Sequence, residues 1–471
     1  MRKENKNLNW YNISLIAFTS MWSISNIFNN YSQQGTQAIF SWVLIIFLYF
    51  IPYIWIVSKL GATFPNSSGG VSIWVEETIN SKMGYLAAWT YWIVNISYLA
   101  QKPQNIIVAI SWLFTMQANT LNHLASWKIA IISLVILIFF MWLSARGINT
   151  LKIIGSIAGG AMLIISMLLI VLSLATFFIF HAKPATSNLT NVSSFIPRFN
   201  TTYFTTLSMF VFAVGGSEKI SPYINYLKNG KNEFPKSMLF LAILVGASAI
   251  LGTYSLGILF NSHAIPKDLI MNGAYVAFQI LGEKFHIGNS LMILYAFSNL
   301  LAQIAALIIS IDAPLKILLS ENNKKYIPHS LMKKNKHNIS INGYILTGIL
   351  TSILIIIPTI KIKNATNFYY WLLNLNSVVI PFKFLFIFLA FIFLIKHQKI
   401  SFTKKFPQIM LGTWIFIITL IISILGMIPK NNIPYHSSQW WFQLSINIST
   451  PIIFAILGII LPIIKKLKNH Q

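Results

Sequence analysis

The sequence predicts an all-α polytopic membrane protein with about twelve transmembrane helices, of which the first and the sixth are discontinuous. Of its 471 residues, 56% are hydrophobic and only 9% are charged. Uncharged runs such as residues 38–57 and 153–180 recur along the chain, and roughly 20 apolar residues are enough for a helix to cross a bilayer. Two hydrophobic segments, about 190 residues apart, are interrupted in their middles by small and polar residues.

Taken in chain order, the apolar runs predict twelve spans, which are helical because a helix satisfies its own backbone groups in lipid. The predicted spans are 11–33, 38–60, 84–116, 127–145, 153–180, 203–227, 236–260, 288–319, 343–361, 367–394, 408–428 and 442–464. Polar residues 66–82 predict a re-entrant or surface piece on the cytoplasmic side, and residues 264–283 a short element on the outside. No loop is long enough to form a folded soluble domain.

These spans form a single predicted transmembrane domain over residues 1–471. Because the interrupted segments are the first and the sixth spans, residues 11–180 and 203–394 are predicted to be inverted repeats of five helices each. Residues 408–464 then add two further helices to this five-plus-five fold.

The charge distribution predicts the orientation of the chain. It carries 34 Lys and Arg residues against 9 Asp and Glu residues, a net charge of +25. With both termini in the cytoplasm, basic residues show a roughly threefold excess in inside loops over outside loops, the positive-inside pattern. The net charge therefore indicates the orientation of the chain and its attraction to anionic lipid. We expect no nucleic-acid partner. The abundance of Ile, Asn and Lys favours an AT-rich bacterial genome, so we expect a protein of the bacterial cytoplasmic membrane.

Matching interruptions in the first and sixth spans are the most informative functional signal. Residues 13–31 are interrupted at the polar stretch 23–26, and residues 203–223 at the glycine-rich stretch 215–218 and again at Pro222. Paired weak spots of this kind are typical of discontinuous helices that hold a substrate near the bilayer midplane. The alternative is a pair of poorly hydrophobic helices buried in a bundle, since small residues also mediate helix packing.

The two breaks are suited to the backbone of an α-amino acid. A broken first span exposes amides at the positive end of the following half-helix, which favours a carboxylate. A broken sixth span offers the carbonyls of residues 211–214 to an ammonium group. The predicted substrate-binding residues at the breaks are Ser23, Ser25, Asn26, Val214, Gly215 and Gly216.

Glu218 directly follows the glycines of the sixth-span break. Acids at membrane depth are costly and are functional candidates by default. Burial favours its protonated form, whereas a nearby lysine favours the carboxylate. A structural alternative is a salt bridge to Lys219 or Lys228 at the cytoplasmic end of the span.

Two lysines fall inside predicted spans. Lys102 lies in the middle of the third helix among polar neighbours, and Lys383 lies in the tenth helix just after a proline. Each could pair with Glu218 or with Asp312 of the eighth helix, replace a sodium ion, or bind an acidic side chain. A buried lysine can also extend its ammonium group to the membrane surface.

Several motifs occur in a characteristic order along the chain. They are Gly216-Ser217-Glu218 continuing through Asn225 and residues 229–235, Phe64-Pro65 with Gly69-Gly70 and Trp74, and Ala313-Pro314-Leu315-Lys316 leading to Ile327-Pro328. In this order and spacing, residues 10–465 resemble the amino acid–polyamine–organocation permease superfamily, most closely its bacterial glutamate:γ-aminobutyrate antiporter branch.

The resemblance implies roles for two further features. It implies that Phe212, four residues before the second glycine of the break, is an aromatic gate over the substrate, and that Glu218 acts in proton sensitivity or coupling. The chain departs from the family pattern at residues 24–26, which replace a glycine-rich motif, at Lys59, where the family usually has glutamate, and at Tyr226, where an acidic residue is common. The architecture therefore carries over more safely than the substrate.

Together these observations predict a secondary active transporter of amino acids that works by alternating access, through exchange or proton coupling, and is not an enzyme. A sodium-coupled symporter of the same fold is an alternative. The sequence favours it less, because it offers Lys102 and Lys152 rather than additional clusters of acidic or hydroxyl side chains. A non-transporting membrane sensor or enzyme is a second alternative. It would need a cluster of catalytic acids or histidines or a soluble domain, and the sequence offers neither. The chain has no cysteine, and we expect no metal and no cofactor.

Overall fold

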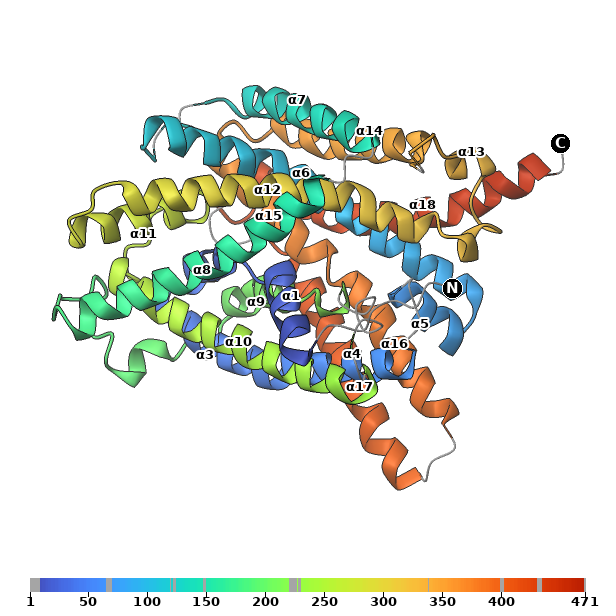
Figure 1. Ribbon diagram of the computed structural model, residues 1–471, viewed down its shortest axis with the longest axis horizontal. Helices are drawn as coiled ribbons and strands as arrows, with labels where there is room; N and C mark the ends of the chain where they lie inside the picture. The colour runs from blue at the N-terminus through green and yellow to red at the C-terminus, as the bar shows by residue number, and fades with distance from the viewer. Residues whose placement is uncertain are drawn as a thin grey trace.

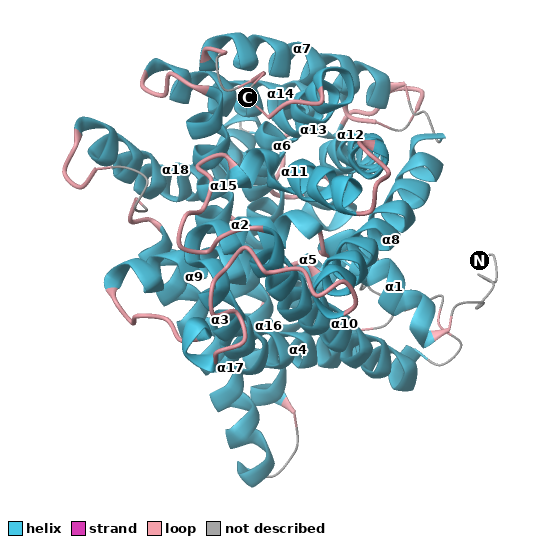
Figure 2. Ribbon diagram, turned by 90° about the vertical axis from the view of Figure 1, so that its left-hand side faces the viewer, coloured by secondary structure: helices cyan, strands magenta, loops and turns pink. Residues whose placement is uncertain are grey.

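The protein is described by a computed structural model that covers residues 9–64, 70–118, 120–121, 124–146, 150–219, 227, 230–337, 339–398, 402–429 and 434–469. Within these residues all regular structure is helical, apart from an isolated β-bridge between Ala125 and Asn364 (Figure 2). Nine helical stretches of the described chain are long and apolar enough to cross a membrane. The predicted all-α polytopic membrane fold is therefore confirmed.

The helices follow one another along the chain with short connections. They are α1 (Trp10–Met21), α2 (Ile24–Gln34), α3 (Ala38–Ile45), a π-helical turn (Ile46–Phe50), α4 (Ile51–Thr63), α5 (Val71–Thr78), α6 (Ser81–Thr115), α7 (Ser126–Ala145), α8 (Thr150–Phe178), α9 (Thr201–Val214), α10 (Gly230–Leu259), α11 (Leu269–Lys284), α12 (Ser290–Leu318), α13 (His329–Met332), α14 (Ile341–Ile356), α15 (Ala365–Val379), α16 (Phe382–His397), α17 (Phe402–Gly426) and α18 (Ser438–Asn469). As far as the described residues reach, each of the twelve predicted spans coincides with one helix or with consecutive helices.

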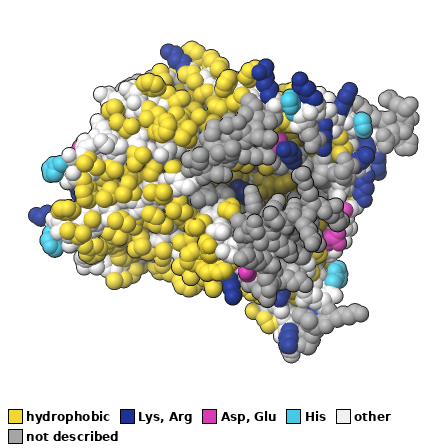
Figure 3. Space-filling view, in the orientation of Figure 1, with side chains coloured by type: hydrophobic (Ala, Val, Ile, Leu, Met, Phe, Trp, Pro, Cys, Tyr) yellow, Lys and Arg dark blue, Asp and Glu magenta, His cyan; other side chains and the backbone are white. Residues whose placement is uncertain are grey.

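The long helices α6 and α12 pack side by side across the middle of the molecule, with α7 and α14 on one side of them and α3, α4 and α10 on the other (Figure 1). The short helices α5 and α11, which correspond to the two predicted polar elements, lie toward opposite ends of the bundle. Hydrophobic side chains form a broad surface over the left part of the visible face, and Lys and Arg side chains gather mainly at the opposite end, near α13 (Figure 3). Such a surface is expected of a protein whose outside contacts lipid.

The first span is broken at Trp22 and Ser23. Both residues have extended backbone angles (φ −93°, ψ 136° and φ −136°, ψ 144°), so α1 ends at Met21. Ser23 caps α2, because its hydroxyl accepts a hydrogen bond from the Ser25 amide at 3.3 Å, the usual role of serine at a helix start. The predicted break in the first helix is confirmed, and it falls at the beginning of the polar stretch.

The sixth span is broken at its two glycines. The helix α9 ends at Val214, Gly215 is extended (φ −79°, ψ 153°), and Gly216 has φ +116°, a conformation that residues with a side chain rarely adopt. One 3₁₀ turn follows over residues 217–219. Residues 211–214 form the last turn of α9, whose carbonyls lie at the break and lack partners within the helix. That these carbonyls receive an ammonium group stays a prediction. The second predicted break, at Pro222, lies outside the described residues.

The tenth span is interrupted at a proline but keeps helical backbone angles there (φ −63°, ψ −37° at Ile380 and φ −60°, ψ −23° at Pro381). This interruption was not predicted from the sequence. The span consists of α15 and α16, joined at Ile380 and Pro381. Proline has no amide hydrogen and its ring displaces the preceding turn, so a helix bends or stops there. Lys383 lies in the first turn of α16, directly after this interruption.

The division of the chain into two inverted repeats, residues 11–180 and 203–394, remains a prediction.

Candidate substrate site

The breaks in the first and sixth spans face each other, as the sequence predicts. The Asn26 side-chain amide donates a hydrogen bond to the Ala213 carbonyl at 3.3 Å, which joins the start of α2 to the end of α9. A Cβ placed on Gly216 would lie 3.4 Å from the Met21 Cβ, so the end of α1 reaches the same place. Two segments almost 190 residues apart in the chain therefore meet at one point.

The first turn of α2 is the part of this meeting point that is suited to an anion. Ser23 and Ser25 flank the helix start, and the amides of the first turn carry the positive end of the helix dipole. A carboxylate bound there would receive backbone hydrogen bonds without needing a charged side chain.

Both glycines of the sixth-span break have a steric reason to be glycine. A Cβ on Gly215 would overlap the ring of Phe384, which is fully buried on α16. Gly216 combines its positive φ with a hydrogen bond from its amide to the Tyr53 hydroxyl of α4 at 3.4 Å. The break is therefore packed tightly against α4 and α16.

Glu218 forms a buried ion pair directly after this break. Its Oε1 lies 2.8 Å from the Lys383 Nζ, and its Oε2 accepts a hydrogen bond from the Tyr53 hydroxyl at 2.5 Å. The Lys383 ammonium also lies over the Tyr91 ring, 4.5 Å from its centre. Of the pairings that the sequence left open for Lys383, the structure forms the one with Glu218. Lys219 makes no such ion pair in the described part of the chain, and Lys228 lies outside it.

Lys102 is also buried, with 7% of its surface exposed, but its contacts are neutral. Its Nζ donates to the Gln303 side-chain oxygen of α12 at 2.9 Å and lies 4.2 Å from the centre of the Tyr98 ring. Among the described residues, neither Glu218 nor Asp312 forms an ion pair with it. The two mid-span lysines therefore differ sharply in their surroundings.

Asp312 does not join the two breaks. It pairs with Lys316 one turn later on α12 at 2.5 Å and accepts a hydrogen bond from the Tyr344 hydroxyl at 3.1 Å. Its side chain is 25% exposed and that of Lys316 is 56% exposed. This is a partly solvated ion pair of the kind that contributes little energy.

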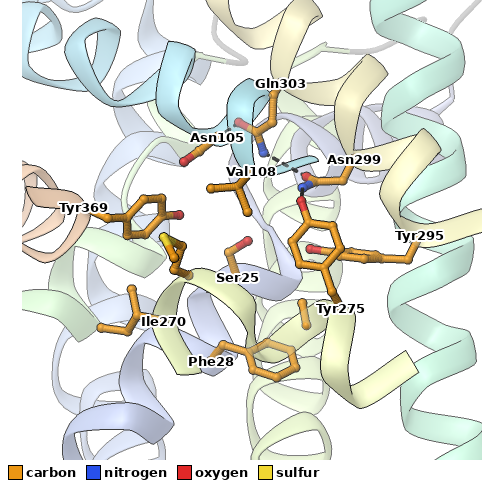
Figure 4. A pocket seen from close by; sticks show the side chains of 12 residues that line it. Ser25, Phe28, Asn105, Val108, Ile270, Tyr275, Tyr295, Asn299, Gln303 and Tyr369 are labelled. Atoms are coloured by element: carbon orange, nitrogen blue, oxygen red, sulfur yellow. Dashed lines mark hydrogen bonds between the residues drawn. The ribbon is translucent and has the colours of Figure 1, made fainter. Parts of the chain in front are cut away.

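A small cavity lies between α2, α6, α11, α12 and α15 (Figure 4). Its volume of about 20 Å³ is enough for about one water molecule. Its lining is Ser25, Phe28, Asn105, Val108, Ile270, Met271, Ala274, Tyr275, Tyr295, Asn299, Gln303 and Tyr369. Of the predicted substrate-binding residues, Ser25 alone lines it. Phe212 is half-buried and Val214 fully buried on α9, and neither lines this cavity.

The polar lining of this cavity was not predicted from the sequence. Asn299 and Gln303 are four residues apart on α12, so they share one helix face, and the Gln303 amide donates to the Asn299 oxygen at 2.9 Å. Asn299 in turn donates to the Tyr275 hydroxyl of α11 at 2.8 Å. The sequence signal that could have indicated this polar lining was the pair of amide side chains, Asn299 and Gln303, in an otherwise apolar span.

Comparison with known proteins agrees with this architecture. Residues 8–460 match the family described as amino acid permease. The chain is 48% identical to an aspartate/glutamate permease of Lactococcus lactis, over 99% of this chain and 97% of the relative. It is 22% identical to a glutamate/gamma-aminobutyrate antiporter of the same species over 90% of this chain and 84% of the relative. A probable agmatine/putrescine antiporter of that species is 23% identical over 52% of this chain and 50% of the relative.

The family match covers nearly the whole chain, includes both helix breaks, and agrees with the resemblance seen in the motifs. The chain therefore belongs to the amino acid permease family. It is a multi-pass bacterial membrane protein that transports amino acids.

Proposed function

We propose that this protein transports acidic amino acids, aspartate or glutamate, across the bacterial cytoplasmic membrane by exchange or proton coupling. The substrate backbone would bind between the two helix breaks, its carboxylate at the first turn of α2 and its ammonium group near the sixth-span break. Ser23, Ser25 and Asn26 would line the carboxylate side, and Val214, Gly215 and Gly216 the ammonium side. Phe212 would close over the substrate.

The charge balance around the breaks carries this proposal. Lys102 and Lys383 are both buried, and Lys219 follows the break, whereas Glu218 is the one acid among these four residues. Glu218 balances Lys383 at 2.8 Å, which leaves the charges of the buried Lys102 and the exposed Lys219 in excess. A site with excess positive charge attracts a substrate with net negative charge. Aspartate and glutamate meet this requirement, and the relative of 48% identity is named for them.

The orientation is proposed from the same pattern of charge. We place both termini in the cytoplasm, because the basic residues near α13 and the end of α18 lie at one end of the bundle and cytoplasmic loops carry the excess of Lys and Arg. Labelling of single cysteines introduced at Lys334 and His263, in cells, would test it. The cysteine-free chain gives no background, and only the cysteine at position 263 should react with an impermeant reagent.

Uptake into proteoliposomes tests the function. Radiolabelled aspartate and glutamate should accumulate, and an excess of either unlabelled acid should compete, whereas putrescine should not. Loading the vesicles with substrate distinguishes exchange from proton coupling, which needs only a pH gradient. If uptake of both acids required sodium, the coupling part of the proposal would be wrong. If neither acid were taken up under any gradient, the substrate class would be wrong.

A further inference from the structure

Lys102 differs from every other feature of the site in being a buried cation held by neutral groups. It lies in the middle of α6, and its ammonium donates to the Gln303 oxygen at 2.9 Å. In contrast to Lys383, it forms no ion pair with a carboxylate in the described residues. Ionisable groups at membrane depth are costly and are retained for a function.

Two donors converge on the same oxygen of Gln303. Besides the Lys102 ammonium, the Asn105 side-chain amide donates to it at 3.0 Å. One neutral oxygen therefore serves a charged donor and an uncharged donor, and Lys102 has further hydrogens to donate. A carboxylate, which accepts about four hydrogen bonds and carries a charge, matches this pair of donors better than an amide oxygen does.

One of these donors, Asn105, and the shared acceptor Gln303 line the cavity beside the first-span break, whereas Lys102 lies behind them and reaches the cavity lining through its hydrogen bond to Gln303. Asn105 and Gln303 line it from α6 and α12, and Ser25 lines it from the first turn of α2 (Figure 4). The amide groups and the serine hydroxyl lie around the same space. A ligand whose α-carboxylate binds at the start of α2 therefore has its other end near the donors that meet at Gln303.

From this arrangement we infer that Lys102, assisted by Asn105, binds the side-chain carboxylate of the substrate and sets the preference for acidic over neutral amino acids. The inference rests on the proposed function, because it assigns a residue to the second carboxylate of aspartate or glutamate. Lys383 does not fill this role, since its charge is already balanced by Glu218 at 2.8 Å. Gln303 is a positioning residue that orients the ammonium group.

The test compares acidic and neutral ligands in three purified variants of the full chain. Lys102→Met should raise the apparent dissociation constant for aspartate by ~10- to 100-fold, the usual effect of losing a charged hydrogen-bond partner. The constant for asparagine, measured by competition, should change by less than ~3-fold. Lys102→Arg retains the charge and should retain the preference for aspartate.

The third variant, Gln303→Glu, keeps the size of the side chain and supplies an internal carboxylate to Lys102. It should weaken aspartate binding as Lys102→Met does, so the inference stays testable even if the lysine variant does not fold. Ligand-induced shifts in melting temperature provide a readout that does not depend on transport. Lys102→Met should also melt no lower than the parent protein, because it removes a buried charge that no acid balances.

The possible outcomes separate the inference from the proposed function. If the parent protein binds aspartate, and Lys102→Met and Gln303→Glu weaken aspartate and asparagine equally, Lys102 acts in coupling or as a substitute for a sodium ion, and the inference is wrong. Unchanged aspartate binding in both variants overturns it as well. If the parent protein binds and transports neither aspartate nor glutamate, the proposed function fails and the inference fails with it.

Discussion

The buried ion pair between Glu218 and Lys383 leads to the sharpest prediction about stability. It connects the residues just after the sixth-span break to the first turn of α16, with 1% of the Glu218 side chain and 9% of the Lys383 side chain exposed. Tyr53 of α4 donates to the same carboxylate at 2.5 Å. Three spans that surround the break are therefore held together by one charged group.

The perturbation consists of Glu218→Gln, Lys383→Met and the double variant. Removing one partner of a buried pair costs about 3–5 kcal/mol, because the remaining charge is buried without compensation. That is a ~100- to 5,000-fold change in a folding equilibrium constant. Removing both partners leaves no buried charge and costs much less. We therefore expect both single variants to melt well below the parent protein and the double variant to melt close to it.

The assay combines melting in detergent with uptake between roughly pH 4.5 and 8, a range that a glutamate with a perturbed environment can titrate through. If Glu218 only stabilises the fold, Glu218→Gln loses folded protein, and the double variant recovers it. If Glu218 instead exchanges protons during transport, Glu218→Gln folds normally and its uptake no longer depends on pH. Additive effects of the two substitutions on melting would refute the reasoning, because a true pair is coupled.

Further predictions concern single residues. Gly215→Ala should abolish uptake and lower the melting temperature because its Cβ meets the Phe384 ring, and trimming that ring in Gly215→Ala with Phe384→Leu should recover part of both. Gly216→Leu should insert into the membrane but not transport, since φ +116° costs about 1–3 kcal/mol for a residue with a side chain; normal uptake would show that the break is not the site. Asn26→Ala should reduce uptake and lower stability by about 1 kcal/mol through loss of its bond between the two breaks, measured by uptake and by melting. Asp312→Asn should leave uptake unchanged and stability within about 1 kcal/mol, because its pair with lysine is partly solvated; a large loss of transport would assign it to the mechanism.

The position of the two breaks could be predicted from sequence because their causes are local. A polar stretch cannot face lipid, and paired glycines weaken a helix wherever they occur. Ser23 is a strong helix-capping residue, so a new helix begins directly after it. At the sixth span the helix ends at the two glycines that the sequence marks, because Gly215 and Gly216 have backbone angles outside the helical range. Val211 and Val214 continue α9, and the chain unwinds only at Gly215.

The sequence left several partners open for each charged residue, because the choice among them depends on how distant spans pack. Lys383 pairs with Glu218 from the first turn of α16, the helix that begins after Pro381. A lysine there is disfavoured by the helix dipole, and the nearby carboxylate offsets that cost. From the sequence, Lys219 and Lys228 were open as partners of Glu218 because they are near in the chain, and Lys102 and Lys383 because they lie inside spans. Nearness in the sequence does not predict an ion-pair partner at a point where the chain has just left a helix.

The contrast between Lys102 and Lys383 shows what the structure adds about function. Both lie in apolar spans close to a proline, Lys102 directly before Pro103 and Lys383 two residues after Pro381, and by sequence the same roles are open to each. In the structure, Lys383 is balanced by a protein carboxylate, whereas Lys102 is held by an amide and an aromatic ring. Removing Lys383 should therefore leave an unbalanced acid and destabilise the protein, whereas removing Lys102 should not. A positive charge that the fold does not need to balance is available to a substrate, and on this ground Lys102 is the residue through which we expect the protein to distinguish aspartate from asparagine.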